Sequence, residues 1–164
     1  EFFSKISTEI SYLAPSKTQI TFKCLCPKAL IVDDDAFNLT ALEMHLMKLK
    51  IPCDSAFNGA IAVNKVKERQ KTRCCANCQQ YSLIFLDYNM PVMDGFETAR
   101  TLREEIKNKT IDELIIIGCT AFVNQNELDK ALQAGMNSYC TKPITPEVVK
   151  QKIKEYAPEL LYLQ

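Results

Sequence analysis

Short apolar runs alternate with segments of helical periodicity along most of this chain. Five runs have the length and composition of buried strands, and they lie at 29–32, 52–57, 83–86, 114–117 and 138–141. After the first run, apolar residues recur at helical spacing at Phe37, Leu39, Leu42, Leu46 and Leu49. Five strand–helix repeats favour a parallel sheet that carries helices on both faces.

The boundaries of the predicted helices carry capping signals. Two helix starts place a capping side chain three residues before a glutamate, a third places threonine before proline, and one helix end has a glycine. These residues are, in that order, Asp94 with Glu97, Asn124 with Glu127, Thr145 with Pro146, and Gly135. The signals fall between the predicted strands, which supports the alternation.

Charge and hydropathy exclude two classes of partner. Twenty basic and twenty acidic residues cancel, so no strong field favours nucleic acid or an anionic membrane surface. No apolar run approaches the ~18 residues of a membrane span. We therefore expect no nucleic-acid partner and no direct membrane contact by this domain.

The chain divides into three predicted segments. Residues 28–157 contain the repeats and form one domain, 1–27 read as a linker or the tail of a preceding domain, and 158–164 read as a C-terminal tail. The first residue is Glu1 rather than methionine, which suggests a fragment of a longer chain.

Eight cysteines are many for 164 residues. Three of them, Cys53, Cys119 and Cys140, lie in strand-like runs, where a free cysteine packs as a small hydrophobe. Three more, Cys74, Cys75 and Cys78, cluster in a polar stretch, and a zinc site there would need Cys24 or Cys26 as its fourth ligand. Reduced thiols in a cytoplasmic protein are the favoured interpretation.

Polar residues follow four of the five predicted strands at their carboxyl ends. These residues are Asp33, Asp34 and Asp35 after the first strand, Asp87 after the third, Thr120 after the fourth, and Lys142 after the fifth. In open α/β sheets, ligands bind at this edge. We therefore expect acids, a hydroxyl and a lysine to converge there, although Asp35 is equally placed to cap the next helix.

Clustered acids repel one another, and a hard divalent cation with oxygen ligands relieves that repulsion. Mg²⁺ typically takes a few carboxylates and keeps several waters. An aspartate beside Mg²⁺, a lysine and a hydroxyl is suited to phosphoryl transfer onto the carboxylate. The buried apolar run before Asp87 leads directly into it, so the strand delivers this carboxylate to the same edge.

Four motifs are similar to those of response-regulator receiver domains, of the kind fused to hybrid histidine kinases. They are LIVDDDAFN, LIFLDYNMPVMDG, IIIGCTA and AGMNSYCTKPIT, in this order, and the similarity covers about residues 28–157. The resemblance implies a flavodoxin-like, doubly wound (βα)5 fold with strand order 2-1-3-4-5. The stretch 67–80 departs from the family, because it is longer and richer in cysteine than expected.

The resemblance also assigns roles to individual residues. Asp87 would be the phosphoacceptor, and Asp34, Asp87 and the backbone carbonyl of Asn89 would bind Mg²⁺ directly, with Asp33 acting mainly through water. Lys142 would contact the phosphoryl group, and a cis peptide bond before Pro143 would aim it inward. Thr120 and Tyr139 would form the switch pair.

A phosphodonor has to come from elsewhere. The only histidine, His45, shares a helix face with polar residues and is expected to face solvent rather than to donate phosphate. The implied partners are therefore a histidine kinase dimerisation domain or a histidine phosphotransfer protein, in the cytoplasm, with a parent chain that is free to be membrane-attached. Such a domain catalyses its own phosphorylation and dephosphorylation, and any kinase activity would belong to the rest of a parent chain.

Three alternatives stay open. The chain could be a stand-alone single-domain response regulator rather than part of a hybrid histidine kinase. An aspartyl-phosphate phosphatase of the haloacid-dehalogenase type needs an aspartate two residues after the nucleophile, where this chain has Asn89. A receiver-like binding module without phosphorylation would be favoured by a missing acid, threonine or lysine, and all are present.

Overall fold

The fold is a parallel sheet enclosed by helices in a computed structural model that describes residues 26–72 and 80–162. The strands are β1 (Ala29–Val32), β2 (Cys53–Ala56), β3 (Leu83–Asp87), β4 (Ile115–Thr120) and β5 (Ser138–Thr141). Their order is β2-β1-β3-β4-β5, and each neighbouring pair is parallel. This order confirms the prediction made from the family resemblance.

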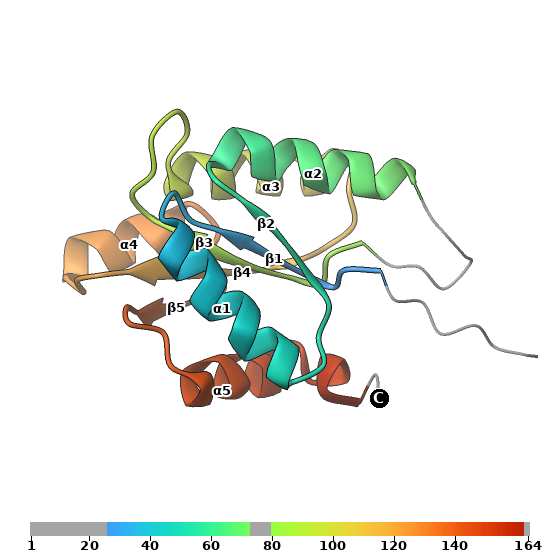
Figure 1. Ribbon diagram of the computed structural model, residues 1–164. Helices are drawn as coiled ribbons and strands as arrows, with labels where there is room; N and C mark the ends of the chain where they lie inside the picture. The colour runs from blue at the N-terminus through green and yellow to red at the C-terminus, as the bar shows by residue number, and fades with distance from the viewer. Residues whose placement is uncertain (1–25, 73–79, 163–164) are drawn as a thin grey trace, which may run out of the picture.

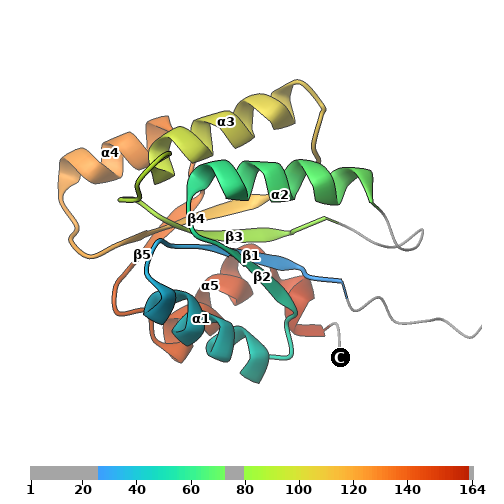
Figure 2. The same ribbon diagram turned by 45° about the horizontal axis from the view of Figure 1, so that its top comes forward.

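Five α-helices and one 3-10 helix connect or follow the strands. They are α1 (Ala36–Lys48), α2 (Gly59–Lys71), α3 (Gly95–Lys107), α4 (Gln125–Gln133), α5 (Pro146–Tyr156) and η1 (Pro158–Tyr162). Helices α1 and α5 cover one face of the sheet, and α2, α3 and α4 cover the other (Figures 1 and 2). No helix among the residues described is long and apolar enough to cross a bilayer.

Each face of the sheet has its own apolar core. Along β1 and β3, alternate side chains point to opposite faces, as the two-residue period of a strand requires. Leu30 and Ile84 pack toward α2–α4, whereas Ile31 and Phe85 pack toward α1 and α5. Because β1 and β3 are buried on both sides, they are apolar throughout, apart from Asp87 at the carboxyl end of β3.

The predicted capping residues are observed at the helix ends. The side chains of Asp94 and Asn124 accept hydrogen bonds from the backbone N–H groups of Glu97 and Glu127, at 2.7 and 2.8 Å. Thr145 caps α5, and Gly135 follows α4 with φ at +85°. Asp35 caps α1, accepting from Phe37 N–H at 2.8 Å, so it serves the helix rather than the acid cluster.

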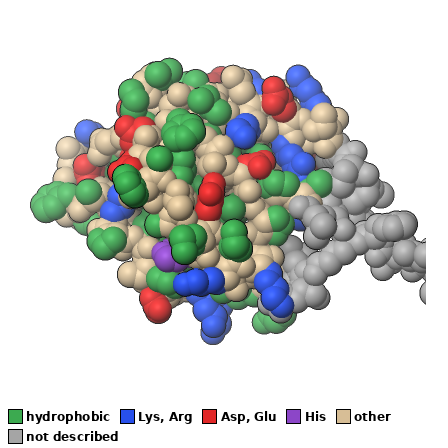
Figure 3. Space-filling view, viewed as in Figure 1, with side chains coloured by type: hydrophobic (Ala, Val, Ile, Leu, Met, Phe, Trp, Pro, Cys, Tyr) green, Lys and Arg blue, Asp and Glu red, His purple; other side chains and the backbone are tan. Residues whose placement is uncertain are grey.

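Two residues of α1 lie in surroundings that their positions in the sequence do not indicate. Phe37 shares the helical spacing of the core leucines, yet its side chain is 86% exposed, because it lies in the first turn, at the rim of the sheet. His45 was expected to face solvent, but it is half-buried, and only part of its ring reaches the surface (Figure 3). Its Nε2 lies 3.2 Å from the carbonyl oxygen of Ile144, which accepts the ring N–H.

The described chain begins and ends on the same side of the molecule. Strand β1 starts at the amino end of the sheet, and α5 returns to that end before η1 (Figure 1). Part of the predicted C-terminal tail is folded, because residues 158–162 form η1 and Leu160 packs in the core. The acid residues lie at the opposite, carboxyl end of the strands.

Gly95 gives a testable constraint on the loop that follows β3. A Cβ atom there would lie 2.2 Å from the carbonyl oxygen of Asp87 and 2.9 Å from the Cα of Tyr88. Both contacts are with backbone, which cannot rotate away, so Gly95→Ala should lower the free energy of unfolding by about 3 kcal/mol. Urea denaturation measures the change. Arg100→Ala, at an exposed position of the same helix, is the control and should change the free energy of unfolding little. A change as small as this in Gly95→Ala would contradict the close approach.

Candidate functional site

Three carboxylates meet at the carboxyl edge of the sheet. Asp33 and Asp34 follow β1, and Asp87 is the last residue of β3. One carboxylate oxygen from each lies within 4.8 Å of the others. Asp33 and Asp87 are buried, the latter 6% exposed, whereas Asp34 is exposed. The adjacent parallel strands β1 and β3 thus bring together the acids that the sequence predicted to converge.

Lys142 supplies a positive charge to this cluster. Its Nζ lies 2.6 Å from Oδ2 of Asp33 and 2.9 Å from Oδ1 of Asp87. Its backbone N–H donates to the carbonyl oxygen of Thr120 at 2.8 Å, which holds the end of β5 beside β4. The predicted cis peptide bond between Lys142 and Pro143 is present.

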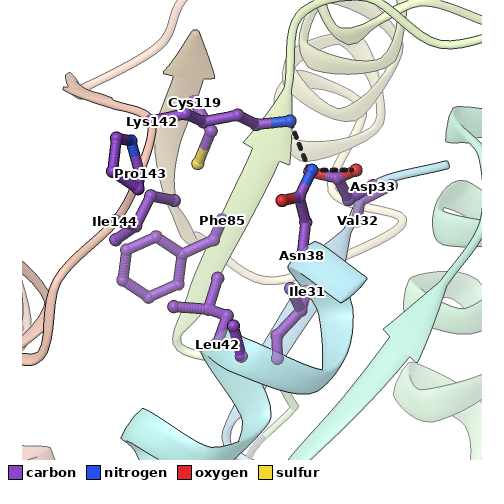
Figure 4. A pocket seen from close by; sticks show the side chains of 11 residues that line it. Ile31, Val32, Asp33, Asn38, Leu42, Phe85, Cys119, Lys142, Pro143 and Ile144 are labelled. Atoms are coloured by element: carbon purple, nitrogen blue, oxygen red, sulfur yellow. Dashed lines mark hydrogen bonds and ion pairs between the residues drawn. The ribbon is translucent and has the colours of Figure 1, made fainter. Parts of the chain in front are cut away.

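Asp33 is fixed by more than its ion pair. Its Oδ1 accepts the backbone N–H of Asp35 at 2.9 Å and the side-chain amide of Asn38 at 3.0 Å. Figure 4 shows Asn38 reaching from α1 toward Asp33 and Lys142. The sequence signal for this contact is the position of Asn38, five residues after Asp33 and in the first turns of the next helix.

Burial and neighbouring charges shift the pKa values of Asp87 and Lys142. Burial raises the pKa of the Asp87 carboxyl, the hydrogen bond from Lys142 opposes this, and the charges of Asp33 and Asp34 add to it. Burial disfavours the charged form of Lys142, but its hydrogen bonds to Asp33 and Asp87 outweigh that and raise its pKa. Lys142 therefore stays charged, while ionised Asp87 benefits from any further cation.

Thr120 ends β4, the strand next to that of Asp87, and Tyr139 lies one strand further away, on β5. Thr120 is buried at the end of β4, and its hydroxyl donates to the carbonyl oxygen of Phe122 at 2.7 Å. Its oxygen also accepts the N–H of Phe122 at 3.2 Å. Tyr139 on β5 is 40% exposed. The hydroxyl of Thr120 is thus engaged in the loop before α4, and the switch role of the two residues stays a prediction.

The donor set fits a hard divalent cation. Carboxylate oxygens on three residues at this separation match the ligands that Mg²⁺ prefers. Asn89 is exposed two residues after the end of β3, and its backbone carbonyl as a ligand stays a prediction. The cysteines at 74, 75 and 78, together with Cys24, lie outside the described residues, so the zinc alternative stays untested.

A small pocket of about 80 Å³ opens on the α1 side of this cluster. Its polar wall contains Asp33, Asn38 and Lys142, and its floor contains Phe85 and Cys119 (Figure 4). Sequence patterns did not predict the pocket, because it depends on how α1 packs against the loop after β5.

A family model, the response regulator receiver domain, matches residues 29–154. The chain belongs to this family. It is 35% identical over 132 residues to hybrid signal transduction histidine kinase L of Dictyostelium discoideum, covering 80% of this chain and 7% of the kinase. It is 37% identical over 126 residues to sensor protein EvgS of Escherichia coli K12, covering 77% of this chain and 9% of that protein. The receiver chain thus spans less than a tenth of these relatives.

Solved structures agree with the assignment. The receiver domain of the Saccharomyces cerevisiae response regulator Ssk1, crystallised with the histidine phosphotransfer protein Ypd1, superposes with a TM-score of 0.70 at 33% identity, covering 80% of this chain and 89% of that one. The receiver domain of Pseudomonas aeruginosa sensor kinase PA1611, which has magnesium in its active-site cleft, gives 0.65 at 24% identity, covering 80% and 98%. The second likeness supports the fold alone. The receiver is therefore a two-component signalling domain with the predicted flavodoxin-like architecture.

Proposed function

We propose that this receiver accepts a phosphoryl group from a phosphohistidine onto Asp87, in a reaction that depends on Mg²⁺. The observation that carries the proposal is the placement of Asp87, buried at a strand end, 2.9 Å from Lys142 and beside two further acids. An isolated buried carboxylate would be costly. Here Lys142 compensates the charge of Asp87, and the metal chemistry of the family uses such a carboxylate.

The residues divide the work of phosphoryl transfer. An ionised oxygen of Asp87 attacks phosphorus, and the bond from phosphorus to the donor nitrogen breaks. Asp34, Asp87 and the Asn89 carbonyl would hold Mg²⁺ directly, with Asp33 acting through water, and the ion would neutralise charge on the phosphoryl oxygens. Lys142 neutralises charge from the other side.

The phosphodonor is a separate domain or protein. His45 is half-buried, and its ring N–H is used by Ile144, which argues against a donor role. The curated relatives are hybrid histidine kinases and sensor proteins, and the Ssk1 receiver was crystallised with a phosphotransfer protein. These likenesses support a histidine kinase dimerisation domain or a histidine phosphotransfer protein as the partner. We propose the cytoplasm as the place of transfer. The likenesses also favour residues 28–157 as the receiver of a hybrid kinase over a stand-alone regulator.

Incubation with acetyl phosphate and Mg²⁺, followed by intact mass spectrometry, tests the proposal. A gain of one phosphoryl group in the presence of Mg²⁺, and no gain when metal-free buffer with EDTA is used throughout, would support it. Rapid turnover of many phosphoesters would instead indicate the phosphatase alternative. An inert protein with bound metal would indicate a binding module.

Thr120 is proposed to transmit the phosphorylated state. If its hydroxyl leaves the Phe122 carbonyl for a phosphoryl oxygen, the loop before α4 loses a hydrogen bond and Tyr139 can rotate inward. Thr120→Ala should therefore leave Asp87 phosphorylatable but abolish chemical-shift changes in residues 124–156 on addition of beryllofluoride. Thr101→Ala is the control, since Thr101 is a half-buried threonine on α3 whose hydroxyl donates to the Glu97 carbonyl of the same helix. Shifts of undiminished size in Thr120→Ala would contradict this role.

Phe122 is proposed to prolong the phosphorylated state. It lies two residues beyond Thr120, is 70% exposed, and has no group that could orient an attacking water. Phe122→Glu supplies such a group, so the rate of autodephosphorylation should rise by about tenfold. Loss of the phosphoryl mass over time measures the rate. Phe122→Leu, which stays apolar, should decay like the parent, and equal rates in the glutamate variant would count against the shielding role.

A further inference from the structure

Two cysteines form a close pair in the core beneath the acid cluster. Cys119 on β4 and Cys140 on β5 are register partners, and their sulfur atoms lie 3.6 Å apart. Both side chains are buried on the α1–α5 side of the sheet. Register partners on neighbouring strands have Cα atoms about 4.8 Å apart, which is within the separation that disulfides bridge.

The pair lies in one row with the phosphoacceptor. Asp87 on β3 is the register partner of Cys119, and Tyr88 N–H donates to the carbonyl oxygen of Cys119 at 3.0 Å. Cys119 directly precedes Thr120, and Cys140 lies two residues before Lys142. A change in the spacing of the two sulfurs is therefore passed along the backbone to groups that surround the reacting carboxylate.

The pocket beside the acid cluster gives a small reagent access to the pair. Cys119 lines this pocket together with Asp33 and Lys142, and its sulfur is drawn there in Figure 4. The volume of about 80 Å³ is several times what one water molecule needs. Hydrogen peroxide is little larger than water, so the pocket can admit it. Bulky disulfide reagents are too large to enter.

We propose that Cys119 and Cys140 are a redox modification site, at which a small hydroperoxide converts the two thiols to a disulfide and thereby slows phosphorylation of Asp87. The first part stands on the thiol geometry alone, and the second part rests on the proposed function. Neither cysteine takes part in the phosphoryl chemistry described above.

The reaction balances with one peroxide for each pair. The Cys119 sulfur, as thiolate, attacks one peroxide oxygen, the O–O bond breaks, and water leaves with the released proton, so that Cys119 becomes a sulfenic acid. The Cys140 sulfur then attacks the Cys119 sulfur, the S–O bond breaks, and a second water leaves. The two thiols supply the two electrons that reduce the peroxide. The hydrogen bond with Cys140, together with burial, raises the pKa of Cys119, so this oxidation should be slow.

The disulfide should disturb phosphoryl transfer because it shortens the contact between Cys119 and Cys140. These residues lie on β4 and β5, the strands that position Thr120 and Lys142. Closing 3.6 Å to a bond of about 2 Å shifts β4 and β5 relative to one another. A misplacement of about 1 Å at reacting groups can lower a rate by about a hundredfold. Part of the shift will be absorbed by side-chain rotation, so we expect phosphorylation by acetyl phosphate to slow by about tenfold.

Peptide mapping of the parent protein tests the modification without any substitution. After treatment with hydrogen peroxide and alkylation of the remaining thiols, trypsin should release peptides 110–130 and 131–150, each of which contains one cysteine. The proposal predicts that they appear as one linked species, lighter by two hydrogens than their sum and separable with dithiothreitol. Both peptides recovered unlinked from fully oxidised protein would overturn it.

Phosphorylation kinetics test the consequence. The oxidised parent should incorporate phosphate about tenfold more slowly and recover in dithiothreitol, whereas Cys140→Ala, checked for folding by circular dichroism, should keep its rate after peroxide. A linked protein that reacts at the unmodified rate would overturn the coupling. If the reduced parent fails to take up phosphate, the proposed function fails, and peptide mapping still decides the thiol site.

Discussion

Replacing Asp87 with asparagine is expected to reduce phosphate incorporation from acetyl phosphate below detection. The amide has no anionic oxygen with which to attack phosphorus, and removing a nucleophile typically lowers a rate by about 10⁶-fold. Asp94→Asn is the matched control, since asparagine still caps α3 and the residue lies outside the acid cluster. Intact mass spectrometry with Mg²⁺ present measures both. Incorporation by the Asp87 variant at the parent rate would show that another residue is the acceptor.

The same variant should be more stable than the parent when metal is absent. Burial raises the pKa of Asp87 above its unfolded value, so the folded state binds the proton more tightly. As pH rises from the unfolded pKa through the folded one, ionisation of Asp87 therefore removes stability. Asp87→Asn avoids this loss. Its urea midpoint should exceed that of the parent at pH 7, and the difference should shrink below about pH 4. A lower midpoint at pH 7 would contradict the direction of the shift.

Lys142→Ala should have the second large effect, on stability as well as on phosphoryl transfer. The lysine is only 18% exposed and lies within 2.9 Å of both Asp33 and Asp87. Its removal leaves two buried carboxylates without their cation, and breaking a buried pair in this way lowers the free energy of unfolding by about 3 kcal/mol. Urea denaturation at pH 7 in metal-free buffer measures the loss.

Magnesium separates this electrostatic effect from a packing defect. The ion binds only the folded acid cluster, so it should stabilise the parent and should stabilise Lys142→Ala by a larger amount, because the variant has more uncompensated charge. Lys150→Ala on the exposed side of α5 is the control and should respond like the parent. An equal response to Mg²⁺ in all three proteins would show that Lys142 does not compensate the acids.

The sequence predicted the sheet and the acid cluster because both depend on local patterns. A short apolar run such as Leu83–Leu86 predicts a buried strand. Parallel strands bring their carboxyl ends to one edge of the sheet. Asp33, Asp34 and Asp87 therefore had to meet. Strand order was inferred from the family motifs, since hydrophobic periodicity does not distinguish one parallel order from another.

Features that depend on packing between distant elements were not predictable in the same way. Phe37 fits the helical stripe of α1, but the stripe continues beyond the edge of the sheet and leaves this ring exposed. His45 lies on a polar face in sequence, yet the loop after β5 folds over it and accepts its ring N–H at the Ile144 carbonyl. The contact between Cys119 and Cys140 also required the register of β4 against β5.

Both ends of the described chain lie opposite the acid cluster, which constrains any phosphodonor that is covalently tethered to this receiver. A tether from Cys26 or Tyr162 starts at the amino end of the sheet. It has to pass along the length of the strands and around a layer of helices to reach the acid cluster. At about 3.3 Å per extended residue, that path takes on the order of ten residues before a donor histidine can reach Asp87. Shorter tethers would enforce transfer between different molecules, whereas longer ones would permit transfer within a single polypeptide.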